Sequence, residues 1–505
     1  MSSPQPTTDT LNRVLNDRFG LEAVRPIQRA VIDRLMAGGD AMLVLPTGGG
    51  KSLCYQLPAV AMPPAPGGPG VTLVFSPLIA LMEDQVQALR ARGIRAAYIN
   101  STLKRREREK VQAELADGAF EIIYATPERM LKDEFRAALD ALPGGVRLLA
   151  VDECHCISKW GHDLRPAYRE VGRFREQLGC PPTVALTATA TAEVRADVRT
   201  VLGLDEQQMP LFAAGIDRPN LGLDAEEVFS DDDKIDRICK AAAQFGGTGI
   251  VYFALIKDLD RMADALRPKL KELGRKIEIY HGRLDPRDKK RAYERFARAT
   301  PDDGLTMFAT NAFGMGVDKS DIRFIVHAQV PGSVEAYWQE VGRAGRDGEP
   351  SQCLLLYQQE DLAIQQQFVE WKNPPPGLLR ELDLVLATKY GDEGHGDFEA
   401  DDLRLDVLGK GRGGGIVEHA VIELEHLGVI ERTGVEDRYR PVRRLRDEDI
   451  DEADIAEKTQ RDLKRLLGVV QMVRGGNIRE RVLDYFGIDS GIDFIIDEDS
   501  LPGPR

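Results

Sequence analysis

Short runs of apolar residues alternate with segments of helical spacing along most of this chain. Between residues 40 and 202 the apolar runs are Met42 to Leu45, Val71 to Phe75, Ile122 to Tyr124, Leu148 to Val151 and Val184 to Leu186. Between residues 249 and 357 they are Ile250 to Phe253, Ile277 to Tyr280, Thr306 to Ala309, Phe324 to His327 and Cys353 to Tyr357. Each run is followed by a polar or glycine-containing loop, which is typical of buried strands in a parallel sheet. The pattern predicts an α/β protein with two successive parallel-sheet units and with functional residues on the loops.

Two proline-containing segments divide the chain. Pro219 lies between the two units and restricts Arg218 to extended conformations, so we expect an interdomain hinge at residues 216–220. The run from Pro374 to Gly377 ends the strand pattern and precedes a helical one. The sequence therefore predicts a first domain over residues 1–215, a second over 216–373, and a C-terminal region over 374–505.

The C-terminal region has mostly helical spacing. One apolar helix face is marked by Val417, Ala420, Val421, Leu424 and Leu427, and two strand-like runs follow it, at 429–433 and 439–442. This order predicts a winged-helix-like segment at about 400–445. A second helical segment, at about 454–487, has an apolar face that we assign to Leu463, Leu466, Leu467 and Val470. The tail after Asp489 is expected to be disordered.

Composition restricts the class of protein. The chain has 505 residues, of which 43% are hydrophobic, and this suggests several ordinary globular domains. Its start lacks the pattern of a secretion signal, and no stretch approaches the ~18 uninterrupted apolar residues of a membrane span, so we expect a cytoplasmic protein. Six scattered cysteines fit reduced thiols rather than disulfides. The pair Cys154 and Cys156 lacks a second ligand pair at zinc spacing.

The net charge of −15 disfavours a polyanion held by global electrostatics. Local basic strips remain as candidates for DNA contact. One is Lys104 to Lys110, and the other is the arginine-rich stretch from Arg432 to Arg446, which includes Tyr439. The alternative for both strips is a solvated surface.

A glycine-rich segment follows the first predicted strand. The residues Thr47, Gly48, Gly49, Gly50, Lys51 and Ser52 read TGGGKS. Between a strand and a helix, such a loop binds phosphates through its backbone N–H groups, with the lysine on the β and γ phosphates and the serine on Mg²⁺. Leu45 stands where the strict motif has glycine, so the match is partial. The structural alternative is a glycine turn with a chance GKS sequence.

Two acidic residues follow the predicted strand at 148–151. Asp152 is therefore expected at the carboxyl end of a buried strand, where open α/β sheets bind their ligands. We expect Asp152 to hold Mg²⁺ and Glu153 to polarise the water that attacks the γ-phosphate. The alternative is that both are merely acids at a sheet end.

Hydrolysis also needs positive charge beside the transition state. Arg343 and Arg346 lie three residues apart in the second unit, near one face of a predicted helix. An ATP site that needs these arginines is completed only when the two units close. The interdomain cleft is then expected to act as a switch.

With these residues in place, the chain resembles superfamily 2 helicases, and among them the RecQ family of DNA helicases. The resemblance covers roughly residues 19–361. It rests on stretches in family order: PTGGGKSLCYQLPA, SPLIALMEDQV, NSTL, ATPER, DECHCISKWGHDLRPAY, ALTATAT, DRPN, FATNAFGMGVDKSDIRFIVH and QEVGRAGRDG. It implies two tandem RecA-like domains, ATP and Mg²⁺ as cofactors, and single-stranded and partly duplex DNA as partners.

The resemblance also assigns roles around the nucleotide. Arg25 and Gln28 are expected near the adenine, Asp318 among the nucleotide-binding residues, and Arg343 and Arg346 on the γ-phosphate. Leu21 stands where the family carries an aromatic residue, which removes one expected stacking contact with the adenine.

Residues 154–168 resemble the family's aromatic-rich loop, which senses single-stranded DNA and signals to the ATP site. Trp160 is the stacking candidate, and the residues expected to relay the signal are His155, His162, Asp163, Arg165 and Tyr168. Leu164 replaces an aromatic residue that is usual in the family.

The resemblance ends before the C-terminal region. The family places a four-cysteine zinc module there, whereas this chain has no cysteine after Cys353 and has Asn477 where the first ligand would stand. We therefore expect no structural zinc. The winged-helix-like segment precedes this point instead of following it, so duplex binding by Arg432 and Tyr439 is a separate hypothesis.

The sequence predicts an ATP-dependent DNA helicase that moves 3′ to 5′ and acts in DNA repair or recombination, a direction and a pathway implied by family. Three alternatives stay open. They are a translocase that does not unwind duplex, an RNA helicase of the same superfamily, and a scaffold protein with an inactive ATP site.

Overall fold

The structure is a computed structural model, and most of the chain is described by it. The described residues are 8–46, 48–77, 79–100, 102–158, 166–213, 217–314, 319–391, 396–408, 415–433 and 438–487.

The first domain is built on a seven-stranded sheet in which every neighbouring pair is parallel, in the order β3-β4-β2-β5-β6-β1-β7. The strands are β1 Ala41–Val44, β2 Val71–Phe75, β3 Ala96–Ile99, β4 Ile122–Ala125, β5 Val146–Val151, β6 Thr183–Thr187 and β7 Leu211–Ala213. The helices are α1 Thr8–Val14, α2 Pro26–Met36, α3 Leu53–Ala61, α4 Ile79–Ala91, α5 Arg105–Ala116, α6 Asp133–Asp140, α7 Pro166–Arg169, α8 Val171–Gln177 and α9 Ala192–Leu202. The strands β1 and β5 lie on either side of β6, which brings the loops after them to one edge of the sheet.

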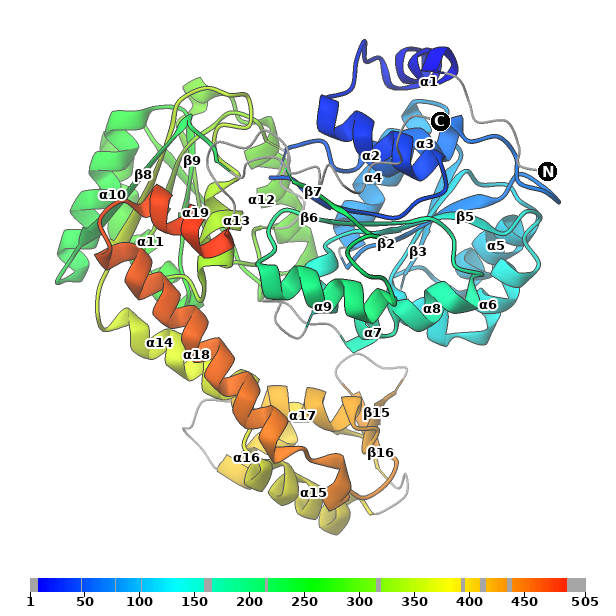
Figure 1. Ribbon diagram of the computed structural model, residues 1–505. Coiled ribbons are helices and arrows are strands. Elements are labelled where there is room, and N and C mark those ends of the chain that lie inside the picture. The colour runs from blue at the N-terminus through cyan, green and yellow to red at the C-terminus, as the bar shows by residue number, and fades with distance from the viewer. Residues whose placement is uncertain are drawn as a thin grey trace.

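The second domain has a six-stranded parallel sheet in the order β10-β11-β9-β12-β13-β8. Its strands are β8 Leu221–Glu227, β9 Thr248–Tyr252, β10 Lys276–Tyr280, β11 Leu305–Ala309, β12 Ile322–His327 and β13 Ser351–Tyr357. Its helices are α10 Asp231–Phe245, α11 Ile256–Glu272, α12 Pro286–Arg298, α13 Val334–Val341 and α14 Asp361–Lys372. The two domains lie side by side (Figure 1). The predicted pair of parallel-sheet domains is confirmed.

Three strands of the two parallel sheets escaped the sequence analysis, and all three lie at the edges of these sheets. The strands β3 and β7 are short, with four and three residues. The strand β8 alternates apolar and acidic residues and pairs only with β13. Because an edge strand is covered on fewer sides, it needs no continuous apolar run.

The C-terminal region contains a small module on a helical stalk. Helices α15 Pro376–Tyr390, α16 Ala400–Leu408 and α17 Gly415–His426 pack with an antiparallel sheet of β14 Phe398–Glu399, β16 Arg438–Pro441 and β15 Ile430–Arg432. The predicted face of α17 is buried, and the two expected strands have a third partner in β14. Helix α18 Glu452–Arg474 runs from this module to the second domain, where α19 Ile478–Phe486 packs (Figure 1).

The apolar face predicted for the segment at 454–487 is confirmed only in part. Leu466 is buried as predicted, but Leu463 and Leu467 are 42% and 52% exposed, and the buried side of α18 continues with Val469 and Met472. Spacing alone could not distinguish the two sides, because the helix has apolar residues on both.

A buried ion pair joins two helices of the second domain. The ammonium of Lys234 in α10 lies 2.9 Å and 3.1 Å from the two carboxylate oxygens of Asp361 at the start of α14, and both side chains are almost fully buried. We expect Lys234→Ala to destabilise the second domain by about 3 to 5 kcal/mol, because it leaves a buried carboxylate without its counter-ion. Thermal unfolding followed by circular dichroism measures this effect. The double change Lys234→Met with Asp361→Leu should unfold close to the parent temperature, and an unchanged midpoint in Lys234→Ala would contradict the assignment.

Candidate active site

The glycine-rich loop connects β1 to α3. Gly48 and Gly50 have φ angles of +81° and +78°, which favour glycine. A Cβ atom on Gly49 would lie 2.8 Å from the carbonyl oxygen of Pro46, so the loop also has no room for a side chain there. The ammonium of Lys51 donates to the carbonyl oxygen of Leu45 at 3.0 Å. This tightly curled backbone before a helix fits a phosphate group. Thr47, which was predicted to join this site, lies outside the described residues.

Arg25 and Gln28 lie against this loop, at the start of α2. The amide of Gln28 donates to the carbonyl oxygens of Gly50 at 3.0 Å and Gly49 at 3.3 Å, and it accepts from the backbone N–H of Arg25 at 2.8 Å. The guanidinium of Arg25 donates to the carbonyl oxygen of Gly49 at 3.4 Å. Both residues predicted for the adenine are therefore placed beside the phosphate loop.

A cavity of about 330 Å³ opens next to these two residues. Its other lining residues include Phe19, Leu21, Leu53 and Arg92. Leu21, which replaces the family's aromatic residue, thus does line the expected adenine pocket. Arg92, whose guanidinium lies 5.8 Å from the centre of the Phe19 ring, was missed by the sequence analysis, because it is one of three arginines within six residues.

The acidic pair sits at the carboxyl end of β5, as expected. Asp152 is 8% exposed, and Glu153 has a φ of +49°, a strained value for a residue with a side chain. Burial and the neighbouring charge of Glu153 raise the pKa of Asp152. Although burial opposes it, His155 and Lys51 lower the pKa of Glu153. Burial lowers the pKa of Lys51 despite the two carboxylates that face it.

These residues fit ATP with Mg²⁺. Ser52 precedes α3 and Asp152 follows β5, and a single strand separates β1 from β5 in the sheet. A hydroxyl and a buried carboxylate are the oxygen ligands that Mg²⁺ takes beside phosphates. A metal ion there would stabilise the negative charge of Asp152, which burial disfavours.

His155 links the acidic pair to β6. Its Nδ1 lies 3.3 Å from the carboxylate of Glu153 and 2.9 Å from the hydroxyl of Thr187. Although burial opposes a charged imidazole, Cys156 and Glu153 raise the pKa of His155. His155 itself is buried, so its place is between the acidic pair and the ALTATAT segment rather than on DNA.

The aromatic-rich loop begins and ends next to the acidic pair. Near its start, the hydroxyl of Ser158 donates to the carboxylate of Asp197 in α9 at 2.7 Å. At its end, the hydroxyl of the buried Tyr168 donates to the carbonyl oxygen of Asp152 at 3.5 Å. The ring of Tyr168 is buried in the core, so the predicted relay role of Tyr168 would act through its contact with Asp152 and not through a base. The other loop residues of the prediction, Trp160, His162, Asp163 and Arg165, lie outside the described residues.

The two arginines of the second domain reach the first domain's site. A Cβ atom on Gly48 would lie 3.6 Å from Cγ of Arg346, so Arg346 is in contact distance of the phosphate loop. Arg343 is 4% exposed, and its positive charge helps to lower the pKa of Glu153. The Nε of Arg343 is buried without a hydrogen-bond partner among the described residues, which leaves a donor for an anion. Asp318, also predicted here, lies outside the described residues.

The helical setting predicted for these arginines is wrong. Helix α13 ends at Val341, and residues 342–347 form successive turns in which Gly345 has a φ of +54°. Glycines at 342, 345 and 348 interrupt the helical pattern, and this signal was available in the sequence.

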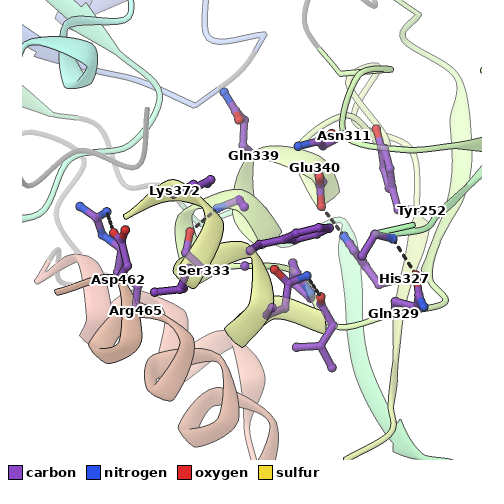
Figure 2. A pocket seen from close by; sticks show the side chains of 18 of the residues that line it. Tyr252, Asn311, His327, Gln329, Ser333, Gln339, Glu340, Lys372, Asp462 and Arg465 are labelled. Carbon is purple, nitrogen blue, oxygen red and sulfur yellow. Dashed lines mark hydrogen bonds and ion pairs between the residues drawn. The ribbon is translucent and has the colours of Figure 1, made fainter. Parts of the chain in front are cut away.

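A cavity of about 420 Å³ lies between the domains on the side of Glu153 and Arg343 (Figure 2). It is also lined by His155, by Asn311 and Gln339 of the second domain, and by residues of α14 and α18 that include Lys372, Asp462 and Arg465. His327 and Glu340 point toward each other in Figure 2 and are 2.8 Å apart. The sequence analysis missed this pair, because one residue ends a strand and the other lies on a helix.

Comparisons with known proteins agree with this geometry. The model of the DEAD/DEAH box helicase family matches residues 25–198, and the model of the helicase conserved C-terminal domain matches residues 233–348. The chain is 35% identical over 479 residues to the probable ATP-dependent DNA helicase RecS of Bacillus subtilis, an alignment that covers 94% of this chain and 88% of that protein. It is 42% identical over 355 residues to the ATP-dependent DNA helicase RecQ of the same organism, which covers 70% of this chain and 57% of RecQ.

The chain belongs to the RecQ family of ATP-dependent DNA helicases. Its fold is also similar to that of the DUF1998 helicase MrfA in a structure bound to DNA, with a TM-score of 0.58, 20% identity, and coverage of 88% of this chain and 60% of that one. The long RecS alignment includes the C-terminal region, whereas the RecQ alignment is about 120 residues shorter.

The arginine-rich stretch of this RecQ-family chain is largely neutralised within the small module. Each of its arginines in the described residues pairs with an acidic side chain: Arg432 with Glu425, Arg438 with Glu399, Arg440 with Asp397, Arg443 with Asp449, Arg444 with Asp383, and Arg446 with Glu448. Tyr439 is 6% exposed and stacks on Phe398. The predicted contact of Tyr439 with DNA is wrong, because the ring belongs to the module's core. Arg432, which lies over this ring, remains a candidate only through its charge.

The position of the family's first zinc ligand has a different role here. The side chain of Asn477 accepts hydrogen bonds from the backbone N–H groups of Arg479 and Glu480 and thereby caps α19. Within the described ranges, no group of three or more His, Cys, Asp or Glu residues is arranged to hold a metal ion. In the same part of the chain, no helix is long and apolar enough to cross a membrane.

Arg343 gives a direct test of the divided site. We expect Arg343→Ala to lower the kcat of ATP hydrolysis roughly 10³-fold, because the transition state loses a positive charge, and to leave nucleotide binding nearly unchanged. Steady-state ATPase assays and titration with a fluorescent ATP analogue measure the two effects. Arg291→Ala, at an exposed arginine of α12, is the matched control. A kcat within twofold of the parent in Arg343→Ala would show that the arginine does not act on the nucleotide.

Proposed function

We propose that this chain couples ATP hydrolysis to movement along single-stranded DNA in the 3′ to 5′ direction and thereby separates the strands of a duplex. The observation that carries the proposal is the contact between Arg346 of the second domain and Gly48 of the phosphate loop. Because the site takes residues from both domains, ATP favours their closure and hydrolysis favours their separation. Family membership and the names of the relatives support DNA as the substrate.

Each residue of the site has a separate role in ATP hydrolysis. Arg25 and Gln28 bind the adenine, and the backbone of residues 48–50 and the ammonium of Lys51 bind the phosphates. Ser52 and Asp152 would hold Mg²⁺, which when bound neutralises phosphate charge. Glu153 accepts a proton from the attacking water, and Arg343 and Arg346 stabilise the negative charge of the transition state.

The aromatic-rich loop is proposed to report DNA to this site. Its two flanking anchors, Ser158 and Tyr168, hold α9 and the backbone of Asp152. A base that stacks on Trp160 would therefore move a segment tied to the acidic pair, and His155 would pass the shift to Thr187.

Translocation without unwinding is the second candidate, and the small module favours it. The arginines of the stretch from Arg432 to Arg446 that the structure describes are paired with acidic side chains, which leaves little of their positive charge to hold duplex DNA. Residues 376–450 contain eighteen acidic and eleven basic residues, which also disfavours a duplex clamp.

The proposed cellular setting follows from the substrate. An enzyme that acts on single-stranded and partly duplex DNA would work in the cytoplasm at the nucleoid, in DNA repair or recombination.

Strand displacement tests the proposal. With ATP and Mg²⁺, the chain should separate duplexes that carry a 3′ single-stranded tail and should leave those with a 5′ tail intact. Lys51→Ala should abolish both DNA-stimulated hydrolysis and strand separation, because the phosphates lose their counter-charge. Undiminished ATP turnover in this variant would refute the assigned site. Rapid single-strand movement without strand separation would favour the second candidate.

The coupling role of the aromatic-rich loop has its own test. We expect Trp160→Ala to reduce the ratio of DNA-stimulated to basal ATP hydrolysis toward one, because a stacking contact worth about 1 to 3 kcal/mol per base is lost. The ratio is measured with an oligonucleotide at saturating concentration. An unchanged ratio would contradict a sensor role for Trp160. Comparison of DNA with RNA of the same sequence distinguishes a DNA helicase from an RNA helicase.

A further inference from the structure

The turn that carries Arg343 and Arg346 is buried at residues 342–345 and contains carbonyl groups that lie beyond the end of helix α13. We call residues 342–349 the arginine turn. Because these residues follow the end of α13, the carbonyl oxygens of Gly342, Ala344 and Gly345 are not part of the regular hydrogen bonding of a helix. Buried carbonyl oxygens need donors, and without them the backbone of this turn would adopt several conformations.

Two carbonyl groups of the arginine turn have donors nearby: Gly345 accepts from the backbone N–H of Gly348 at 3.0 Å, and Glu349 accepts from the hydroxyl of Ser351 at 3.3 Å. The other donors come from the DRPN segment between the two domains. The guanidinium of Arg218 donates to the carbonyl oxygens of Gly342 at 3.4 Å, Ala344 at 3.0 Å and Gly345 at 2.7 Å. The amide of Asn220 donates to the carbonyl oxygens of Gly345 at 2.9 Å and Glu349 at 3.0 Å. Two side chains therefore satisfy four carbonyl groups of the arginine turn.

These contacts fit closely at Gly345. A Cβ atom on this glycine would lie 2.4 Å from Nδ2 of Asn220, and its φ of +54° also favours glycine. The backbone at residue 345 can approach Asn220 this closely because glycine has no side chain. The arginine turn and the DRPN segment thus form one fitted unit.

The same contacts revise the position of the hinge. The sequence predicted a hinge at residues 216–220, but Arg218 and Asn220 are both bonded to the second domain. Residues 217–220 therefore move with the second domain, and that part of the prediction is wrong. Ile216, the remaining residue of the predicted hinge, lies outside the described residues.

The C-terminal helix α19 holds the DRPN segment from its other side. The guanidinium of Arg479 pairs with the carboxylate of Asp217 and donates to the carbonyl oxygens of Arg218, at 3.1 Å, and Leu221. Six residues farther on, the hydroxyl of Tyr485 donates to the carboxylate of Glu335 in α13 at 2.8 Å. Helix α19 therefore contacts both the segment that supports the arginine turn and the helix that leads into it.

We propose that Arg218 and Asn220 are positioning residues for ATP hydrolysis, and that Arg479 connects the C-terminal region to them. The two DRPN side chains hold the arginine turn so that Arg343 and Arg346 face the phosphates, and α19 holds the DRPN segment. The inference rests on the proposed function, because it concerns the rate of the same ATP hydrolysis.

The kinetic consequence follows from where the arginines act. They stabilise charge that develops in the transition state, so a displaced arginine turn lowers kcat. The phosphate loop lies in the first domain, and so do all the lining residues of the cavity expected to take the adenine, so no described residue of the DRPN segment lines that cavity. The KM for ATP is therefore expected to stay close to that of the parent.

Asn220→Asp is the sharpest single test. It keeps the size of the side chain but replaces the amide donors with a carboxylate oxygen that repels the two carbonyl groups. We expect kcat for DNA-stimulated hydrolysis to fall about tenfold or more, with KM within about twofold and an unchanged affinity for a fluorescent ATP analogue. Arg479→Ala should cause a smaller loss of the same kind. Arg481→Ala, at an exposed residue of the same helix, is the matched control and should hydrolyse ATP like the parent.

A second readout separates positioning from loss of stability. If Asn220 acts through the arginine turn, Asn220→Asp should cost less in an Arg343→Lys background than in the parent, because both changes impair the same group. If the fold reductions in kcat of Asn220→Asp and Arg343→Lys simply multiply in the double variant, the proposal is overturned. So would a kcat within twofold of the parent in both Asn220→Asp and Arg479→Ala, or an equal loss in Arg481→Ala. A parent protein without ATP turnover would instead contradict the proposed function.

Discussion

The close approach of Arg346 in the second domain to Gly48 of the phosphate loop is the constraint on which the proposed ATP site depends. The phosphate loop and the acidic pair belong to the first domain, whereas Arg343 and Arg346 belong to the second. In the proposed mechanism, neither domain alone would then contain a complete ATP site. A change in the distance between the sheets would change the rate of hydrolysis, and hydrolysis would in turn change that distance.

A site divided in this way needs rigid support on both sides of the cleft. In the first domain, the support is the sheet itself, because β1 and β5 end beside each other across β6. In the second domain, the arginines lie beyond the end of α13, where no regular element fixes them. Arg218 and Asn220 supply the missing hydrogen bonds, and Gly345 allows the close approach. The segment between the domains is thus part of the second domain's ATP-site architecture.

The sequence was informative where chemistry needs particular residues in particular places. The phosphate loop, Asp152, Glu153, Arg25 and Gln28 were all predicted, and the structure brings them together at one sheet edge. It was less informative where the fold depends on contacts between distant residues. The hydrogen bonds of Arg218 to residues more than a hundred positions away carry no local signal. Tyr439 looked like a stacking residue among arginines, yet pairing with β14 places its ring in a core. Helix α18 has apolar residues on two sides, so the sequence did not show which side is buried.

The C-terminal module is connected to this machinery through a short set of packed elements. A Cβ atom on Gly415, at the start of α17, would lie 2.5 Å from the ring of Trp371, so the module is fitted tightly onto α14. Helix α14 packs on α18, and both line the cavity that also contains Glu153 and Arg343. Helix α18 then leads directly to α19 and Arg479. Because closely packed helices move as units rather than bend, a load on the module would reach the arginine turn through α18 and α19. A change in the orientation of the module would therefore be transmitted to the arginine turn through packed helices, although none of the module's described residues lines the two cavities beside Glu153 and the phosphate loop.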